Sequence, residues 1–350
     1  TLPTLAATLP LRQLSVAGNG ISGPLGSVPA SLEVIELQYN RLNGTIPASY
    51  VTLVNLTTLN LAENQLDGTL PSLTGLPSLS YLDVHTNFLE GSIPTTSWLA
   101  AQRYIDISEN EFIGTLDFRA LDNLGFLDVH SNQFSGSLPC VGTSSPSPLK
   151  LLDFASNLFS GSMPACWSSL TNLETLILDS NSLSSQIPDY ITTFTKLRTL
   201  SMLLSPLLED PDNPSTARST LPTELFSLPV LETFSITSAL LSGTIPGAHT
   251  PTALKKLIII NTQISGTIPA SLACQTCALE WLDLSQNQLR GTIPSSFAAL
   301  PSLSTLKLQS NQNLSGSIPP LSHSLTLLWM QGNEFTTAFD GEEGSHYANL

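Results

Sequence analysis

Apolar residues recur along the chain in short alternating runs, and an asparagine follows each run. In one such unit, Leu59 and Leu61 alternate with Asn60 and Ala62, and Asn64 comes next. Alternation of this kind over a few positions is typical of a short β-strand with one buried face. The unit therefore predicts one strand per repeat, with the two leucines facing inward and their neighbours facing outward.

The same unit returns at a nearly constant interval. The asparagines that end successive runs are 22 to 25 residues apart, and they are Asn40, Asn64, Asn87, Asn110, Asn132, Asn157 and Asn181. A Gly-(Thr/Ser)-apolar-Pro segment recurs with them, at Gly44, Gly68, Gly91, Gly136, Gly161, Gly243, Gly266, Gly291 and Gly316. Periods in this range indicate a solenoid, in which each unit forms one coil. With weaker copies included, we expect about fourteen coils.

Each recurrent residue has a structural role in such a coil. Stacked strands form a parallel sheet, and an inward-facing asparagine amide can bond backbone groups of the next coil that would otherwise be buried unpaired. Glycine permits the tight turn, and proline fixes φ where no ladder hydrogen bond is needed. The Thr or Ser after each turn glycine forms a further row, as in ice-binding solenoids, but serines and Gln186 interrupt it.

The full pattern, Leu-x-x-Leu-x-Leu-x-x-Asn-x-Leu-x-Gly-x-Ile-Pro, resembles plant-type leucine-rich repeats over essentially the whole chain. The resemblance implies a single solenoid over residues 1–350, with a curved parallel β-sheet on the concave face and loops and short 3-10 or helical turns on the convex face. Similar proteins include plant receptor ectodomains, polygalacturonase-inhibiting proteins and surface glycoproteins of algae and other protists. The sequence lacks the paired-cysteine caps of plant receptors and is rich in Ala, Ser, Thr and Pro. Both features favour a protist or algal surface protein.

Two features interrupt the regular repeat. One interval is longer by an acidic insertion at about residues 206–219, which predicts a protruding loop; we favour a tolerated insertion over a partner-gripping island. The first and last repeats are incomplete, so we expect that caps lie beyond them or that neighbouring protein covers them.

Charge and composition narrow the class of protein. The net charge of −15 disfavours nucleic acid as a partner. Charged residues make up only 11% of the chain, compared with roughly 25% in ordinary soluble domains. No stretch has the apolar length of a membrane span or the pattern of a signal peptide, so we expect neither within these residues. Asn-x-Ser/Thr sequons occur at Asn43, Asn55 and Asn313. We therefore expect an extracellular or cell-surface glycoprotein.

The four cysteines predict two disulfides. Cys140 and Cys166 occupy nearly equivalent places in consecutive coils, which lie about 5 Å apart in a parallel sheet, so a bridge between them is within reach. Cys274 and Cys277 form a Cys-x-x-Cys motif, which also suits a redox dithiol or half a zinc site. Without a second cysteine pair or a thioredoxin-like context, we favour a small structural disulfide.

No enzyme motif assembles in the sequence. There is no nucleophile elbow, no phosphate-binding glycine-rich loop and no His-Glu-x-x-His motif, and the repeat turns account for the glycines. We therefore expect no catalytic residues, no cofactor and no metal.

The outward columns of coils four to seven carry a distinctive set of side chains. Counted back from the asparagines, aromatic residues, aspartates and histidines fall into three adjacent columns on the concave face. This acidic-aromatic patch consists of Tyr81, Tyr104 and Phe126; Asp83, Asp106, Asp128 and Asp153; and His85 and His130.

The patch has a functional and a structural interpretation. Its rings can offer apolar faces. Its carboxylates can accept hydrogen bonds from a peptide's Lys or Arg or from sugar hydroxyls, or they can bind a cation. Four like charges roughly 5 Å apart repel, so we expect a cationic counterpart or raised pKa values. Alternatively, Leu-Asp-Leu/Val is simply a habitual form of the repeat, as Asp283 shows elsewhere, and the histidines are solvated.

Two functions remain open on this basis. The first is a non-enzymatic extracellular recognition module that binds a protein, peptide or glycan on its concave face. The second is a structural component of an extracellular assembly, such as a cell wall, adhesin or surface filament. Such a component would pack through its flanks and ends against copies of itself or other chains.

Overall fold

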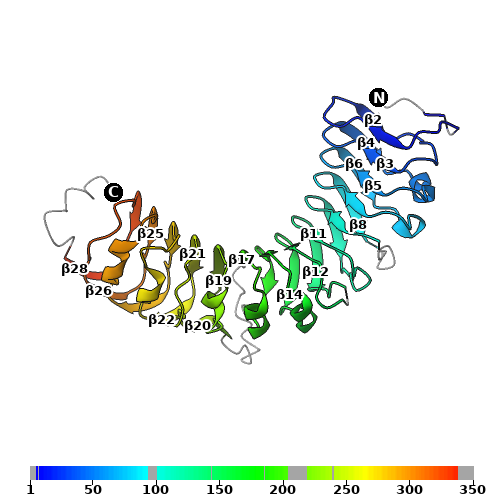
Figure 1. Cartoon of the computed structure of the whole chain (residues 1–350). Helices are drawn as coiled ribbons and strands as arrows, with labels where there is room; N and C mark the ends of the chain where they lie inside the picture. Colours follow the sequence, from blue (N-terminus) through cyan, green and yellow to red (C-terminus); the bar gives the residue numbers. More distant parts are fainter. Residues whose placement is uncertain are drawn as a thin grey trace, which may run out of the picture. The chain divides into compact units, whose positions relative to one another are not determined.

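The computed structural model describes residues 5–6, 8–93, 101–142, 144–184, 186–203, 219–238 and 240–337. They divide into two compact units, Thr1–Leu173 (unit 1) and Glu174–Leu350 (unit 2), and each is described by itself. Figure 1 shows that both consist of short strands stacked coil upon coil. Among the described residues, no helix is long and apolar enough to cross a bilayer.

In unit 1, one strand of a parallel sheet lies in each coil, as the alternating pattern predicts. Leu82 and Leu127 at two strand centres are 0% exposed, and Tyr81 is in register with Tyr104 of the next coil. The strands of this first sheet are β1 (Gln13–Ser15), β3 (Val34–Glu36), β5 (Thr58–Asn60), β7 (Tyr81–Asp83), β9 (Tyr104–Asp106), β11 (Phe126–Asp128) and β13 (Leu151–Asp153).

A second strand follows the asparagine in each coil, so the prediction of one strand per repeat was wrong. These segments pair with one another in a second parallel sheet, which Figure 1 shows beside the first. Gly68, at φ 71°, illustrates the close approach of the coils, because a Cβ there would lie 2.8 Å from Thr45 Cγ2. The threonine row thus packs on the turn glycines. The strands are β2 (Ser22–Pro24), β4 (Arg41–Thr45), β6 (Gln65–Thr69), β8 (Phe88–Ser92), β10 (Glu111–Gly114), β12 (Gln133–Ser137) and β14 (Leu158–Gly161).

Unit 2 has the same two-strand coil. Its first-sheet strands are β15 (Thr175–Ile177), β17 (Thr199–Leu203), β19 (Thr233–Thr237), β21 (Lys256–Ile260), β23 (Trp281–Asp283), β25 (Thr305–Lys307) and β27 (Leu327–Trp329). The remaining strands are β16 (Ser182–Leu183), β18 (Ser219–Thr220), β20 (Leu241–Thr244), β22 (Gln263–Gly266), β24 (Gln288–Gly291), β26 (Asn313–Ser317) and β28 (Glu334–Thr337). The predicted acidic loop lies outside the described residues except for Ser219, which begins β18.

Short 3-10 helices follow the repeat prolines in both units, which confirms the predicted turns. Pro47, Pro164 and Pro294 each directly precede one, with φ between −60° and −73°. The helices are η1 (Ala48–Thr52), η2 (Leu73–Gly75), η4 (Ala165–Ser169), η5 (Asp189–Thr193), η6 (Leu225–Ser227), η7 (Ala270–Leu272) and η8 (Ser295–Ala299).

The repeat asparagines form a buried ladder of hydrogen bonds. Asn87 Nδ2 donates to the carbonyls of Val84 and His85 in its own coil and to Leu61 in the coil before, and its Oδ1 accepts from the Leu66 N–H. The sequence predicted that the asparagine amide bonds backbone groups of the next coil. This was wrong, because the amide donates to a carbonyl of the preceding coil. Its role in pairing buried backbone groups is confirmed.

Both predicted disulfides are present. Cys140 and Cys166 bridge consecutive coils with their Cα atoms 5.9 Å apart. Cys274 and Cys277 close a short loop with their Cα atoms 5.1 Å apart. Beside the first bridge, Trp167 Nε1 donates to the Pro139 carbonyl at 2.9 Å, so the disulfide lies against a well-bonded part of the core.

Candidate functional site

The aromatic column of the patch forms a continuous stack on unit 1. The Tyr81 and Tyr104 ring centroids are 4.2 Å apart with an interplanar angle of 9°, and the Tyr104 and Phe126 centroids are 4.2 Å apart at 8°. Parallel register places the three rings at equivalent positions of β7, β9 and β11, so the strand spacing produces the stack. Each residue is half-buried, which leaves part of each ring accessible.

The carboxylate column is more buried than an outward-facing row implies. Asp83 is 4% and Asp106 8% exposed. Each patch aspartate turns back to accept the backbone N–H two residues on, for example from Ser108 to Asp106 Oδ1 at 3.1 Å. Asp283 in unit 2 makes the same bond. This local bond explains why the repeat accepts aspartate here, as the structural interpretation predicts.

Electrostatics nevertheless distinguish the patch from the rest of the repeat. Burial raises the pKa of Asp106, and the charges of Asp128 and Asp83 on adjacent strands raise that pKa further, against hydrogen bonds from Ser108 that lower it. Within the described residues, the ion pairs of Asp83, Asp106 and Asp128 are with histidine, and none is with Lys or Arg. Burial is the largest cause of this shift, so the raised pKa of Asp106 reflects the expected repulsion between like charges only in part.

Both patch histidines are bonded to the aspartate two residues before them. His85 Nδ1 lies 2.6 Å from Asp83 Oδ1, and His130 Nδ1 lies 2.7 Å from Asp128 Oδ1. The hydrogen bond to aspartate is the main cause that raises the pKa of each histidine to about 9, against a smaller lowering by burial. Neither imidazole is a freely solvated surface group.

Sequence reasoning missed two further acidic residues beside these histidines. Glu63 Oε1 lies 3.8 Å from His85 Nε2, and Glu109 Oε1 lies 3.4 Å from His130 Nε2. Both glutamates adopt a left-handed backbone, with φ of 49° and 51°. Each glutamate directly precedes a ladder asparagine, and this shared position could have identified them from the sequence. The predicted columns ended two residues before the asparagine and so left them out.

The Tyr81 hydroxyl links the aromatic and carboxylate columns. It donates to Asp83 Oδ2 at 3.3 Å. Burial, followed by the charge of Asp83, raises the pKa of Tyr81 to about 12. The phenol therefore stays protonated at neutral pH and can donate this hydrogen bond.

Unit 2 carries a different aromatic group, which sequence reasoning also missed. Lys307 Nζ lies 5.0 Å from the Trp281 ring centroid and 4.4 Å from that of Trp329, and Lys256 Nζ lies 5.6 Å from Trp281. Lys307 is also 3.9 Å from Asp283. These residues occupy the columns of the patch in later coils, so extending the columns would have found them.

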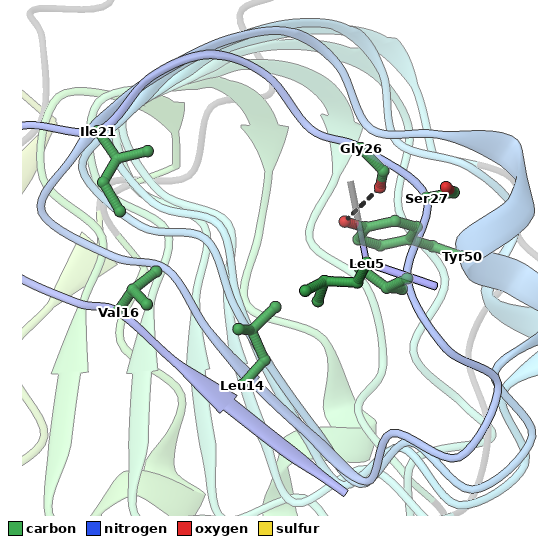
Figure 2. A pocket seen from close by; sticks show the side chains of 8 residues that line it. Leu5, Leu14, Val16, Ile21, Gly26, Ser27 and Tyr50 are labelled. Atoms are coloured by element: carbon green, nitrogen blue, oxygen red, sulfur yellow. Dashed lines mark hydrogen bonds between the residues drawn. The ribbon is translucent and has the colours of Figure 1, made fainter. Parts of the chain in front are cut away.

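An apolar pocket lies in the first coil of unit 1, away from the patch. Figure 2 shows Leu14, Val16 and Ile21 around it, with Leu5 and the ring of Tyr50 on its other side. The Tyr50 hydroxyl donates to the Gly26 carbonyl at 3.2 Å. The described residues that line this pocket include none that is charged, and its lining offers mainly apolar contacts.

The three sequons lie at the surface. Asn43 in β4, Asn55 between η1 and β5, and Asn313 in β26 are all exposed. Each side chain is therefore accessible to glycan attachment.

Comparison with known proteins agrees with this fold. A family model described as leucine rich repeat matches residues 30–89 and 252–312, and a second one matches residues 172–194. A search of curated protein sequences finds no significant match.

Solved structures match over most of the chain. A TDR receptor is 31% identical with a TM-score of 0.77, over 91% of this chain and 55% of the receptor. The plant peptide hormone receptor RGFR1, in complex with RGF2, is 28% identical with a TM-score of 0.79, over 93% and 51%. The chain thus spans about half the length of these receptors. A Leptospira interrogans LRR protein has the same fold, at 24% identity and a TM-score of 0.67, over 100% of this chain and 86% of that one.

Repeat pattern, coil geometry and these matches agree in both units: the chain folds as leucine-rich repeats, and it is similar to plant receptors over about half of their length.

Proposed function

We propose that the chain is a non-enzymatic, extracellular recognition module whose acidic-aromatic patch binds a peptide or protein segment carrying lysine or arginine. The observation that carries this proposal is the stacked aromatic strip beside a carboxylate row that no Lys or Arg of the described residues neutralises at Asp83, Asp106 or Asp128. Asp83, Asp106 and Asp128 outnumber the two histidines that pair with them, so the row keeps a net negative charge that favours a cationic partner. Ring faces attract cations and aliphatic stems.

The acceptor geometry supports a guanidinium or ammonium ligand. The backbone N–H and the hydroxyl of Ser108 both donate to Asp106 Oδ1, at 3.1 and 2.6 Å. Oδ2 of Asp106 therefore retains acceptor capacity, beside the half-buried Tyr104 ring on the same strand. A side chain lying along the strip would place its apolar stem on the rings and its charge at this carboxylate.

The relatives support a peptide as the ligand class. The RGFR1 structure holds the peptide hormone RGF2, and RGFR1 is among the matches above 25% identity. Because this chain spans about half of that receptor, its own partner is argued from the patch and not transferred from the relative.

A charge-matched pair of double variants tests the proposal. Peptides enriched from a random displayed library on the wild-type chain are measured against Asp106→Asn/Asp128→Asn and Glu90→Gln/Glu111→Gln. Both variants remove two charges, and asparagine can still accept the backbone N–H at positions 108 and 130. Glu90 and Glu111 are exposed residues of the second sheet.

We expect enriched peptides rich in Lys or Arg and aromatic-compatible residues, with about 10-fold weaker binding to the patch variant and little change in the control. Enrichment of acidic or neutral peptides, preference for glycans over any peptide, or equal losses in both variants would each refute the proposal.

We further propose that Asn43, Asn55 and Asn313 carry glycans, because all three are exposed sequons. Mass spectrometry of the chain secreted from eukaryotic cells, before and after enzymatic deglycosylation, tests this. Unmodified asparagine at all three positions would contradict it.

A further inference from the structure

We propose that the patch contains two copies of one divalent metal site, in which a histidine Nδ1 and two carboxylates from neighbouring strands hold a Zn²⁺ ion. The first copy is Asp83, His85 and Asp106, and the second is Asp128, His130 and Asp153. This inference does not depend on the proposed peptide function, and metal binding is measured without any peptide.

The first set already has the compactness of a metal site. One ligand atom from each of Asp83, His85 and Asp106 lies within 4.8 Å of the other two. The nitrogen that faces both carboxylates is Nδ1 of His85, at 2.6 Å from Asp83 Oδ1 and 3.9 Å from Asp106 Oδ2. Zinc takes imidazole nitrogen and carboxylate oxygen at about 2.0–2.2 Å, so small side-chain rotations suffice to enclose an ion.

The second set repeats the first with the same residues on the same columns. One ligand atom from each of Asp128, His130 and Asp153 also lies within 4.8 Å of the others, and His130 Nδ1 lies 2.7 Å from Asp128 Oδ1. In both sets Asp and His come from one coil, and the further Asp comes from the next. The intervening coil has Ser108 at the histidine position, and it forms no such set among the described residues.

A second, independent observation is the carboxylate on the far side of each imidazole. Glu63 lies 3.8 Å from His85 Nε2, and Glu109 lies 3.4 Å from His130 Nε2. A metal-ligating histidine almost always donates its other ring N–H to a carboxylate, carbonyl or water, which fixes the tautomer and the ring. Both glutamates stand where this outer partner is needed, and a solvated surface histidine needs none.

Charge and ligand type select the metal. Two carboxylates balance one divalent ion, and the imidazole, which releases its proton as the ion binds, adds a nitrogen ligand that Ca²⁺ and Mg²⁺ do not favour. We expected no metal from the sequence because it holds no compact ligand motif. Here the second carboxylate comes from the next coil, 23 or 25 residues away.

Isothermal titration with Zn²⁺ of the chelator-treated, desalted chain tests the inference. We expect two Zn²⁺ per chain, one after His85→Ala, one after His130→Ala, and none in the double variant. His249→Ala and His323→Ala should keep both ions. Glu63→Gln should weaken one site by about 10-fold.

Ser285→His provides a matched negative control in unit 2. It creates the same Asp-x-His pair beside Asp283, but the next strand carries Lys307 in place of aspartate, so no additional ion should bind. Circular dichroism confirms that each variant is folded, and His85→Gln replaces His85→Ala if the latter is not.

Three results would overturn the inference: no saturable Zn²⁺ binding, a stoichiometry that the double histidine variant leaves unchanged, or tighter binding of Ca²⁺ than Zn²⁺. The peptide proposal is unaffected by any of them, because its readout is peptide binding, which is measured with EDTA present.

Discussion

The coil of Tyr104 in unit 1 and the coil of Trp281 in unit 2 share one local design and differ in what lies on the next strand. Both place an aromatic residue, an aspartate and a serine in the three outward columns, and both serines donate to the aspartate Oδ1 at 2.6 Å. The next strand then carries Asp128 in unit 1 and Lys307 in unit 2.

The difference separates what the repeat needs from what the patch adds. The aspartate itself is a feature of the backbone, because it accepts the N–H two residues on in both units. Its electrostatic setting is not: Asp283 has Lys307 at 3.9 Å, whereas the neighbouring charge of Asp128 helps to raise the pKa of Asp106. Of these two coils, as far as their described residues go, only that of Asp106 places its aspartate next to a further carboxylate and without a Lys or Arg counterion.

The largest expected effect comes from breaking the aromatic stack. Tyr104→Ala removes the central ring and both of its contacts, so we expect unit 1 to lose about 2 kcal/mol of stability. Trp329→Ala in unit 2 should cost less than about 1 kcal/mol, because Trp329 is 43% exposed. Urea denaturation followed by circular dichroism measures both, and equal losses would show that the stack adds nothing beyond ordinary burial.

The pH dependence of stability sharpens the comparison. In metal-free protein the pKa values of His85 and His130 are raised from 6.5 to about 9 by folding, so the protonated forms are stabilised. Their contribution is complete below pH 6.5 and is lost as the pH rises through about 9, by on the order of 1 kcal/mol per histidine.

Denaturation at pH 6 and pH 10, with EDTA present, measures this loss. The variant His85→Gln/His130→Gln should lose much less stability over the same range. A wild-type chain that is more stable at pH 10 than at pH 6 would contradict the assigned hydrogen bonds.

The smallest expected effect on stability comes from removing one charge that faces a charge on the neighbouring strand. Such a change should stabilise the protein in unit 1 and destabilise it in unit 2. Asp106→Asn keeps the acceptor for Ser108 and removes the middle charge of the row, so it should stabilise by about 0.5 kcal/mol. Lys307→Met removes the countercharge of Asp283 and should destabilise by a similar amount. The urea denaturation midpoints of the two variants measure these changes. Stability changes of the same sign in both would mean that charge compensation does not distinguish the units.

The sequence was enough to predict the coil and the columns. The Asn-to-Asn period placed Tyr81, Tyr104 and Phe126 on adjacent strands, and the strand register confirms this. The places of Cys140 and Cys166 shortly after the prolines of consecutive coils predicted their disulfide, which is present. These predictions succeed because a parallel stack converts sequence period directly into spatial neighbours.

What the sequence could not give depends on side-chain direction and on short irregular segments. The second sheet was not predicted because segments such as Gln65–Thr69 contain a turn glycine and show no clear alternation of apolar and polar residues. The burial of Asp83 and Asp106 follows from rotamers that fold back onto the backbone. Ala62, expected to face outward, is 1% exposed, because a one-carbon side chain is covered by its larger neighbours.

The most direct test of the central claim is hydrogen exchange, read by mass spectrometry, on the chain with and without an enriched basic peptide. We predict that the peptide increases protection from exchange in the segments that contain β7, β9 and β11. Exchange in the segments that contain β23 and β25 should stay unchanged. Protection confined to β23 and β25, or spread equally over both units, would contradict it.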